Sequence, residues 1–64
     1  MTYRKFARLH NISPQWLCQI LNGAKISDDL AMRLSATTGK PVSVFFGEKE
    51  KRREAVIKYI KNNN

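Results

Sequence analysis

Two glutamines, Gln15 and Gln19, stand four residues apart in a short stretch that runs from Ser13-Pro14 to Asn22-Gly23. Serine is a good N-cap and proline is favoured at the first helical position, so a helix is predicted to start at Pro14. Side chains four residues apart lie on one face of a helix, one turn from each other. A carboxamide both donates and accepts hydrogen bonds, which matches the N6 and N7 edge of adenine. The spacing therefore predicts two side chains that can meet successive base edges in a major groove.

This helix is predicted to have two different faces. Its apolar residues point one way, towards a core: Leu17, Ile20 and Leu21. The opposite face holds the residues that we expect to contact bases: Gln15, Gln19, Pro14 and Cys18. Pro14 has no side-chain donor, so we expect it to make only apolar contact, for instance with a thymine methyl. We expect Cys18 to be a small contact side chain and not a redox sensor, because no activating group is evident beside it.

Four further residues stand at the ends of this helix or on the border of its exposed face: Ser13, Trp16, Asn22 and Lys25. Free N–H groups at a helix start add donors for phosphate. Trp16 lies on the border between the two faces and has two interpretations. It packs on a sugar or thymine methyl, or it fills the space between the first two helices.

The charge distribution favours a polyanionic partner. The 64 residues contain 12 basic and 5 acidic side chains, a formal net charge of +7. The first 26 residues contain no acidic residue, and their basic residues are Arg4, Lys5, Arg8 and Lys25. Such an acid-free segment is typical of a surface that contacts phosphate.

The charged run near the C-terminus has a different pattern. Its basic residues, Lys49, Lys51, Arg52 and Arg53, alternate with Glu48, Glu50 and Glu54. Glu48 and Arg52, and likewise Glu54 and Lys58, are spaced for pairing along one helix. The run therefore predicts a solvated helix face.

The elements that must position these residues are all helical, because apolar residues recur with a helical period and no β-alternation appears. Tyr3, Phe6, Ala7 and His10 form one stripe after the N-cap Thr2, and Asn11 suits the helix end. A third helix is predicted from Ser27 to Gly39, with inner residues Leu30, Ala31, Leu34 and Thr38. A one-turn helix over 42–46 and a charged helix over 48–61 complete the chain.

A helix-turn-helix needs a small residue, a turn residue and two apolar residues at fixed offsets, and Ala7, Asn11, Leu17 and Ile20 supply them. The stretch 6–23, followed by Leu30-Ala31-Met32-Arg33-Leu34, resembles the phage repressor and Cro-like family, also called the XRE or lambda-repressor-like family. The resemblance covers residues 3–46, and it implies that Ser13, Asn22 and Lys25 contact the phosphodiester backbone while Trp16 flanks the groove. It implies an all-α, compact bundle of four to five short helices with a central helix-turn-helix, here lacking the family's usual first helix. Asn11 stands where the family usually has glycine, and asparagine also adopts positive φ.

We expect two parts, a helix-turn-helix core over 1–47 and a charged C-terminal helix and tail over 48–64. The C-terminal helix is expected to cover the surface of the missing helix through Val56, Ile57 and Ile60, either by folding back or by crossing to a partner subunit. Two apolar sets are available, 42–46 and 56–60. One set is expected to close the core, which leaves the other for a homodimer.

The resemblance implies a sequence-specific double-stranded DNA-binding transcriptional regulator, a Cro-type repressor of phage or mobile-element origin. It would bind a two-fold symmetric operator as a homodimer, with recognition helices one DNA turn apart. The alternative is a HigA-type antitoxin, which binds a toxin and represses its own operon, since 21–34 is similar to that group as well. A third alternative is a protein-interaction adaptor that has kept the fold and lost DNA binding.

Other classes are excluded by what the sequence lacks. One cysteine, Cys18, and one histidine, His10, allow no intramolecular disulfide and no closed zinc site. We expect no metal, no cofactor and no enzyme activity, because no nucleophile–base pair or phosphate loop is present. The sequence contains no apolar stretch long enough to predict a membrane span. A lone thiol favours a cytoplasmic setting. His10 is expected to be a half-buried neutral imidazole with one hydrogen bond, not a pH switch.

Overall fold

The computed structural model describes residues 1–63, and within that range the chain forms five helices and no strand. The helices are α1 (Tyr3–Leu9), α2 (Pro14–Leu21), α3 (Asp28–Thr38), α4 (Ser43–Phe46) and α5 (Lys49–Asn62). The predicted all-α fold of short helices is confirmed, and each boundary lies within two residues of the sequence signal.

The predicted caps explain where the helices start and stop. Thr2, Ser13 and Ser27 have extended backbones, and each side-chain oxygen accepts the N–H three residues later, at 3.1, 3.0 and 3.3 Å. Such caps satisfy a backbone donor that the first helical turn leaves free. Asn11, with φ of 59°, and Gly39, with φ of 73°, adopt the left-handed conformation after α1 and α3.

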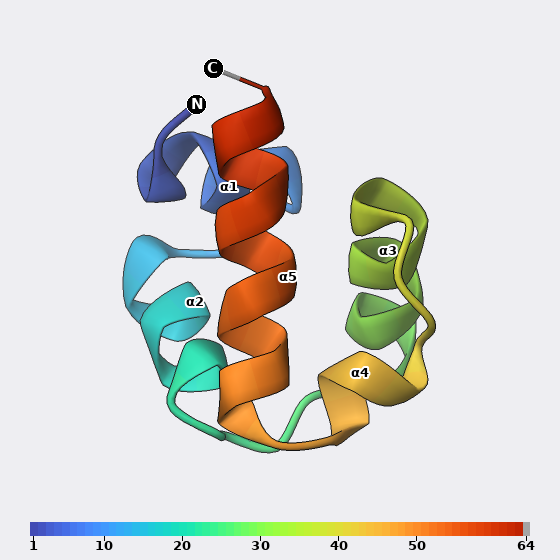
Figure 1. The fold of residues 1–64 in the computed structure, drawn as a ribbon. Helices are drawn as coiled ribbons and strands as arrows, with labels where there is room; N and C mark the ends of the chain where they lie inside the picture. Colours follow the sequence, from blue (N-terminus) through green and yellow to red (C-terminus); the bar gives the residue numbers. More distant parts are fainter. Residues whose placement is uncertain (64) are drawn as a thin grey trace.

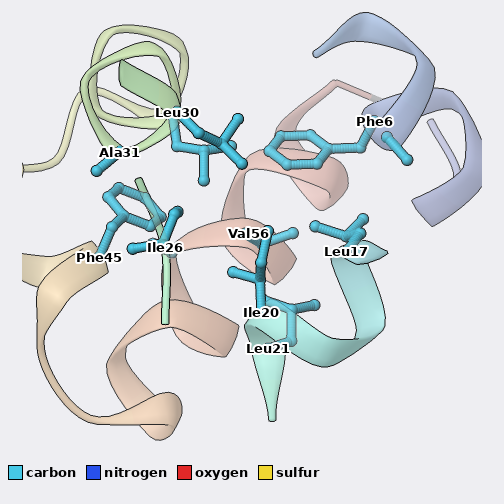
Figure 2. Close-up of a cluster of buried hydrophobic side chains, with 12 residues drawn as sticks. Phe6, Leu17, Ile20, Leu21, Ile26, Leu30, Ala31, Phe45 and Val56 are labelled. Carbon is cyan, nitrogen blue, oxygen red and sulfur yellow. The ribbon is translucent and has the colours of Figure 1, made fainter. Parts of the chain in front are cut away.

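The core gathers side chains from all five helices (Figure 2). Its buried apolar residues are Phe6, Ala7, Leu17, Ile20, Leu21, Ile26, Leu30, Ala31, Leu34, Phe45, Ala55 and Val56. Figure 2 shows Val56 between the α2 side chains and those of α3 and α4. Because Val56 is fully buried, α5 contributes to the hydrophobic core of the helix-turn-helix itself.

The C-terminal helix folds back onto its own chain, which is the first of the two expected arrangements. Figure 1 shows α5 (orange to red) running between the α1–α2 pair on one side and the α3–α4 pair on the other. Near its far end the ring of Tyr59 meets the ring of Phe6 edge-on, with centroids 5.6 Å apart. The Met1 amine lies 3.4 Å from the carbonyl of Asn63, so the two ends of the described chain adjoin.

The two apolar sets are each divided between core and surface, so the expectation that one whole set closes the core is wrong. Phe45 and Val56 are completely buried, whereas Val42, Phe46 and Ile57 are 37%, 48% and 37% exposed. The physical reason is the helical period, since neighbouring residues on α4 or α5 point in different directions.

Candidate nucleic-acid interface

The helix α2 is held in place by one apolar face. Leu17, Ile20 and Leu21 are buried in the core, as predicted. Ser13 and Pro14 start the helix, and the Ser13 hydroxyl accepts the N–H of Trp16 at 3.0 Å. The direction of the opposite face is therefore fixed.

That opposite face is exposed and carries all four residues expected to contact bases: Pro14, Gln15, Cys18 and Gln19. The backbone-contacting candidates Ser13, Asn22 and Lys25 are exposed at its two ends. Trp16 is partly buried and packs against the core. Part of its ring fills space in the protein and part remains exposed, so both interpretations of Trp16 stay open. The structure thus brings the predicted residues together on one side of one helix.

The turn between α1 and α2 is as tight as the motif requires. Ala7 is completely buried, and its carbonyl accepts the N–H of Ile12 at 3.0 Å. Asn11 takes the left-handed conformation between them. A side chain larger than alanine would have no room at this crossing, which explains the small residue in the motif.

A basic hollow lies beside the start of α2. Its volume is about 510 Å³. Its lining comes from both helices of the motif and from the turn between them: Arg4, Arg8, Asn11, Ile12, Pro14 and Gln15. Arg4 and Arg8 stand one turn apart on α1 and are exposed. The first turn of α2 contains no acidic residue; Pro14 has no N–H and the N–H of Trp16 bonds to the Ser13 hydroxyl, so the N–H of Gln15 is the donor that this turn offers. An anion is the natural ligand of such a surface.

The other end of α2 is bound by arginines that sequence reasoning assigned wrongly. Arg52 was expected to pair with Glu48 on a solvated face, but it is only 5% exposed. Its Nη1 donates to the carbonyls of Ile20, at 2.9 Å, and Ala24, at 2.6 Å. A guanidinium can be buried here because it finds backbone carbonyls at the negative end of a helix dipole.

The neighbouring Arg53 is half-buried and reaches the same helix end. Its Nε donates to the carbonyl of Leu21 at 2.7 Å, and its Nη2 donates to Oδ1 of Asn22. The signal for Arg52 was present in the sequence, because it precedes Ala55 and Val56 by three and four residues and so shares their helix face. No comparable signal exists for Arg53.

The carboxamide of Asn22 is engaged within the protein. Besides accepting from Arg53, it donates through Nδ2 to the carbonyl of Cys18 at 2.9 Å. The same Nδ2 lies 3.5 Å from the sulfur of Cys18. Asn22 is thus held in one orientation on the exposed face.

His10 differs from the expectation of a half-buried ring with one hydrogen bond. Its side chain is 4% exposed, and its Nε2 has no hydrogen-bond partner among the described residues. The ring packs against Phe6 with centroids 4.8 Å apart, and Arg33 donates to the His10 carbonyl at 3.3 Å. Burial, and secondarily the charge of Arg33, lowers the pKa of His10 below its usual 6.5. The imidazole is therefore neutral near pH 7, as expected.

Residues 1–63 contain no group of three or more histidine, cysteine or acidic side chains placed to hold a metal ion. They also contain no helix of the length and hydropathy that crossing a membrane requires. Comparison with protein-family models, with curated proteins and with solved structures finds no match for this chain.

Proposed function

We propose that this chain is a sequence-specific double-stranded DNA-binding transcriptional regulator with α2 as its recognition helix. The observation that carries the proposal is the exposed face of α2, where Gln15 and Gln19 stand one turn apart and Gln15 borders the hollow lined by the exposed Arg4 and Arg8. The carboxamides have the donors and acceptors to distinguish base pairs, and the arginines have the charge to hold phosphate. No acidic residue occurs in the first 26 residues to repel the DNA.

We further propose that the protein acts as a Cro-type repressor on a two-fold symmetric operator. A recognition helix of 8 residues spans only about 12 Å, so one subunit contacts few base pairs. A dimer doubles the contacted sequence. Val42, directly before α4, and Phe46, its last residue, are exposed apolar side chains and form the surface that we assign to the dimer. Changing Phe46 to serine should then lower the mass in sedimentation from dimer to monomer.

The first experiment measures DNA binding directly. Duplexes are selected from a random pool with the wild-type protein, and the affinity for the selected duplex is measured by fluorescence anisotropy at about 50 and 200 mM salt. A scrambled duplex of the same composition is the comparison. Because bound cations release counterions from DNA, affinity should fall steeply with salt on both duplexes. Absence of salt-dependent binding to any duplex would sink the proposal.

The second experiment tests the glutamine face. Gln19→Ala should lower the affinity for the selected duplex by about tenfold and leave the scrambled duplex nearly unaffected. Asn62→Ala is the matched control, since it removes an exposed carboxamide from α5, away from α2. An equal loss on both duplexes would show that Gln19 does not distinguish bases.

A further inference from the structure

The C-terminal end of α2 is bound by a segment about thirty residues further along the chain. Arg52 and Arg53, one turn into α5, donate to three backbone carbonyls there, those of Ile20, Leu21 and Ala24. The distances are 2.6 to 2.9 Å. The carbonyl of Ile20 also accepts the N–H of Gly23, whereas the arginines supply donors to the carbonyls of Leu21, the last residue of α2, and of Ala24, just beyond it.

The charges of the two arginines suit this position. The last turn of α2 contains no basic residue of its own. The C-terminal end of a helix carries partial negative charge, which cations stabilise. Backbone N–H groups also close this end, since Gly23 has a φ of 100° and the N–H groups of Gly23 and Ala24 bond to the carbonyls of Ile20 and Gln19. The cations that bond to the end of the helix holding Gln15 and Gln19 therefore come from α5.

Arg53 also reaches the exposed face itself. Its Nη2 bonds to Oδ1 of Asn22, while Nδ2 of Asn22 bonds to the carbonyl of Cys18. Arg53 and Ile57 from α5, with Tyr3, Cys18 and Asn22, border a hollow of about 370 Å³ along this side of α2. One guanidinium therefore joins the backbone end of α2 to a side chain on its exposed face.

We propose that Arg53 is a positioning residue for base recognition, which fixes the end of α2 and the carboxamide of Asn22 relative to α5. The inference rests on the proposed DNA-binding function. It assigns to Arg53 an effect on sequence preference, transmitted through Asn22 and α2, and no phosphate contact of its own. Arg52 lies behind it and holds the same helix end from within the core.

A lysine cannot replace this arginine, although it keeps the charge. The guanidinium presents donors in a rigid fork and here uses two of them on Leu21 and Asn22. An ammonium on a flexible stem does not hold both acceptors in one geometry. Arg53→Lys therefore separates positioning from simple electrostatic attraction.

The test compares Arg53→Lys with Lys58→Met, which removes a charge from an exposed position on the same helix. Arg53→Lys should lower the affinity for the selected duplex by about tenfold, with the scrambled duplex and the salt dependence unchanged. Lys58→Met should leave the preference between the two duplexes unchanged. An equal loss on both duplexes in Arg53→Lys, or no loss on either, would overturn the proposal.

A double-mutant cycle with Asn22→Ala gives a second arm. Since Arg53 acts through Asn22, the loss in the double variant should be clearly smaller than the combined losses of the single variants. Full additivity would show that the two residues act independently and would also overturn the proposal.

A third readout needs no DNA. Hydrogen exchange at the amides of Gly23 and Ala24, which bond to the carbonyls of Ile20 and Gln19, should be faster in Arg53→Lys than in wild type. Unchanged exchange overturns the anchoring by Arg53, whether or not the protein binds DNA. If the wild-type protein binds neither duplex, the proposed function is overturned. If exchange is nevertheless faster in Arg53→Lys, the bonds from Arg53 to the end of α2 remain as a structural contact.

Discussion

The two ends of this chain are both basic, yet their arginines lie in opposite environments. Arg4 and Arg8 on α1 are exposed around an open hollow beside the start of α2. Arg52 is buried and Arg53 half-buried, and both donate to carbonyls at the end of α2. The guanidinium groups of Arg4 and Arg8 face solvent, whereas those of Arg52 and Arg53 donate hydrogen bonds within the protein.

The difference teaches that charge count alone does not show where a cation acts. An arginine turns inward only where it finds acceptors, because a buried unpaired charge is costly. The end of α2 offers such acceptors, and Ala55 and Val56 draw that face of α5 into the core. The basic residues of α1 lie outside its apolar stripe and are exposed.

Removing the C-terminal end should have the largest effect. A chain ended at Gly47 loses Val56 from the middle of the core and both arginines from the end of α2. A domain this small buries only about 60% of its unfolded surface, so we expect it not to fold. Circular dichroism should show no cooperative thermal transition. A chain ended at Lys61, which keeps every buried residue of α5, is the control, and an unchanged melting temperature at Gly47 would contradict the role of α5.

Arg52→Met should have the next largest effect. The substitution leaves the carbonyls of Ile20 and Ala24 without their charged donor, and it should lower the free energy of unfolding by about 3 kcal/mol. Urea denaturation measures the change, and the exposed Lys51→Met should change it by less than about 0.5 kcal/mol. An equal or raised free energy in Arg52→Met would mean that desolvation of the guanidinium outweighs its bonds.

The exposed arginines should show the reverse pattern. Arg4→Gln combined with Arg8→Gln should lower the affinity for the selected and scrambled duplexes by similar factors, with a salt slope smaller by about two. The melting temperature should change little, since both side chains are exposed. Lys61→Gln, at the far end of α5, serves as the control. Loss confined to the selected duplex would show that these arginines contact bases and not phosphate.

The smallest effect on stability is expected from His10. Its ring packs against Phe6 of α1, and its carbonyl accepts from Arg33 of α3. Its pKa is lowered in the folded state by burial and by Arg33, so the unfolded chain takes up the proton first as pH falls. Stability should therefore decrease as pH drops below about 6.5. Urea denaturation at about pH 7.5 and 5.5 measures this, and His10→Gln should flatten the dependence. A greater stability of wild type at the lower pH would contradict the sign.

Much of the local structure was predictable because its causes are local. Thr2, Ser13 and Ser27 satisfy N–H groups only three residues away, and Asn11 and Gly39 permit a left-handed turn at one position. The two faces of α2 follow from its own helical period, so Gln15 and Gln19 were assigned to its exposed side from the sequence alone.

The contacts of α5 were not predictable in the same way. Its arginines meet Ile20, Leu21 and Ala24 across separations of 28 to 32 residues. Glu48, four residues before Arg52, is a nearer partner in the sequence, so the local rule predicted a solvated face. The packing of α5 against α2 shows that backbone carbonyls, and not a glutamate side chain of the same helix, accept from these arginines.

The sequence by itself determined the helices, their caps and the face of α2 that carries the glutamines, since each depends on interactions within a few residues. Tertiary structure decided that α5 folds back, that Val42 and Phe46 are left on the surface, and that Arg52 and Arg53 hold the end of α2. These outcomes depend on which distant groups meet when apolar surface is buried. Helical periodicity shows which face turns inward but not which carbonyl it will find there.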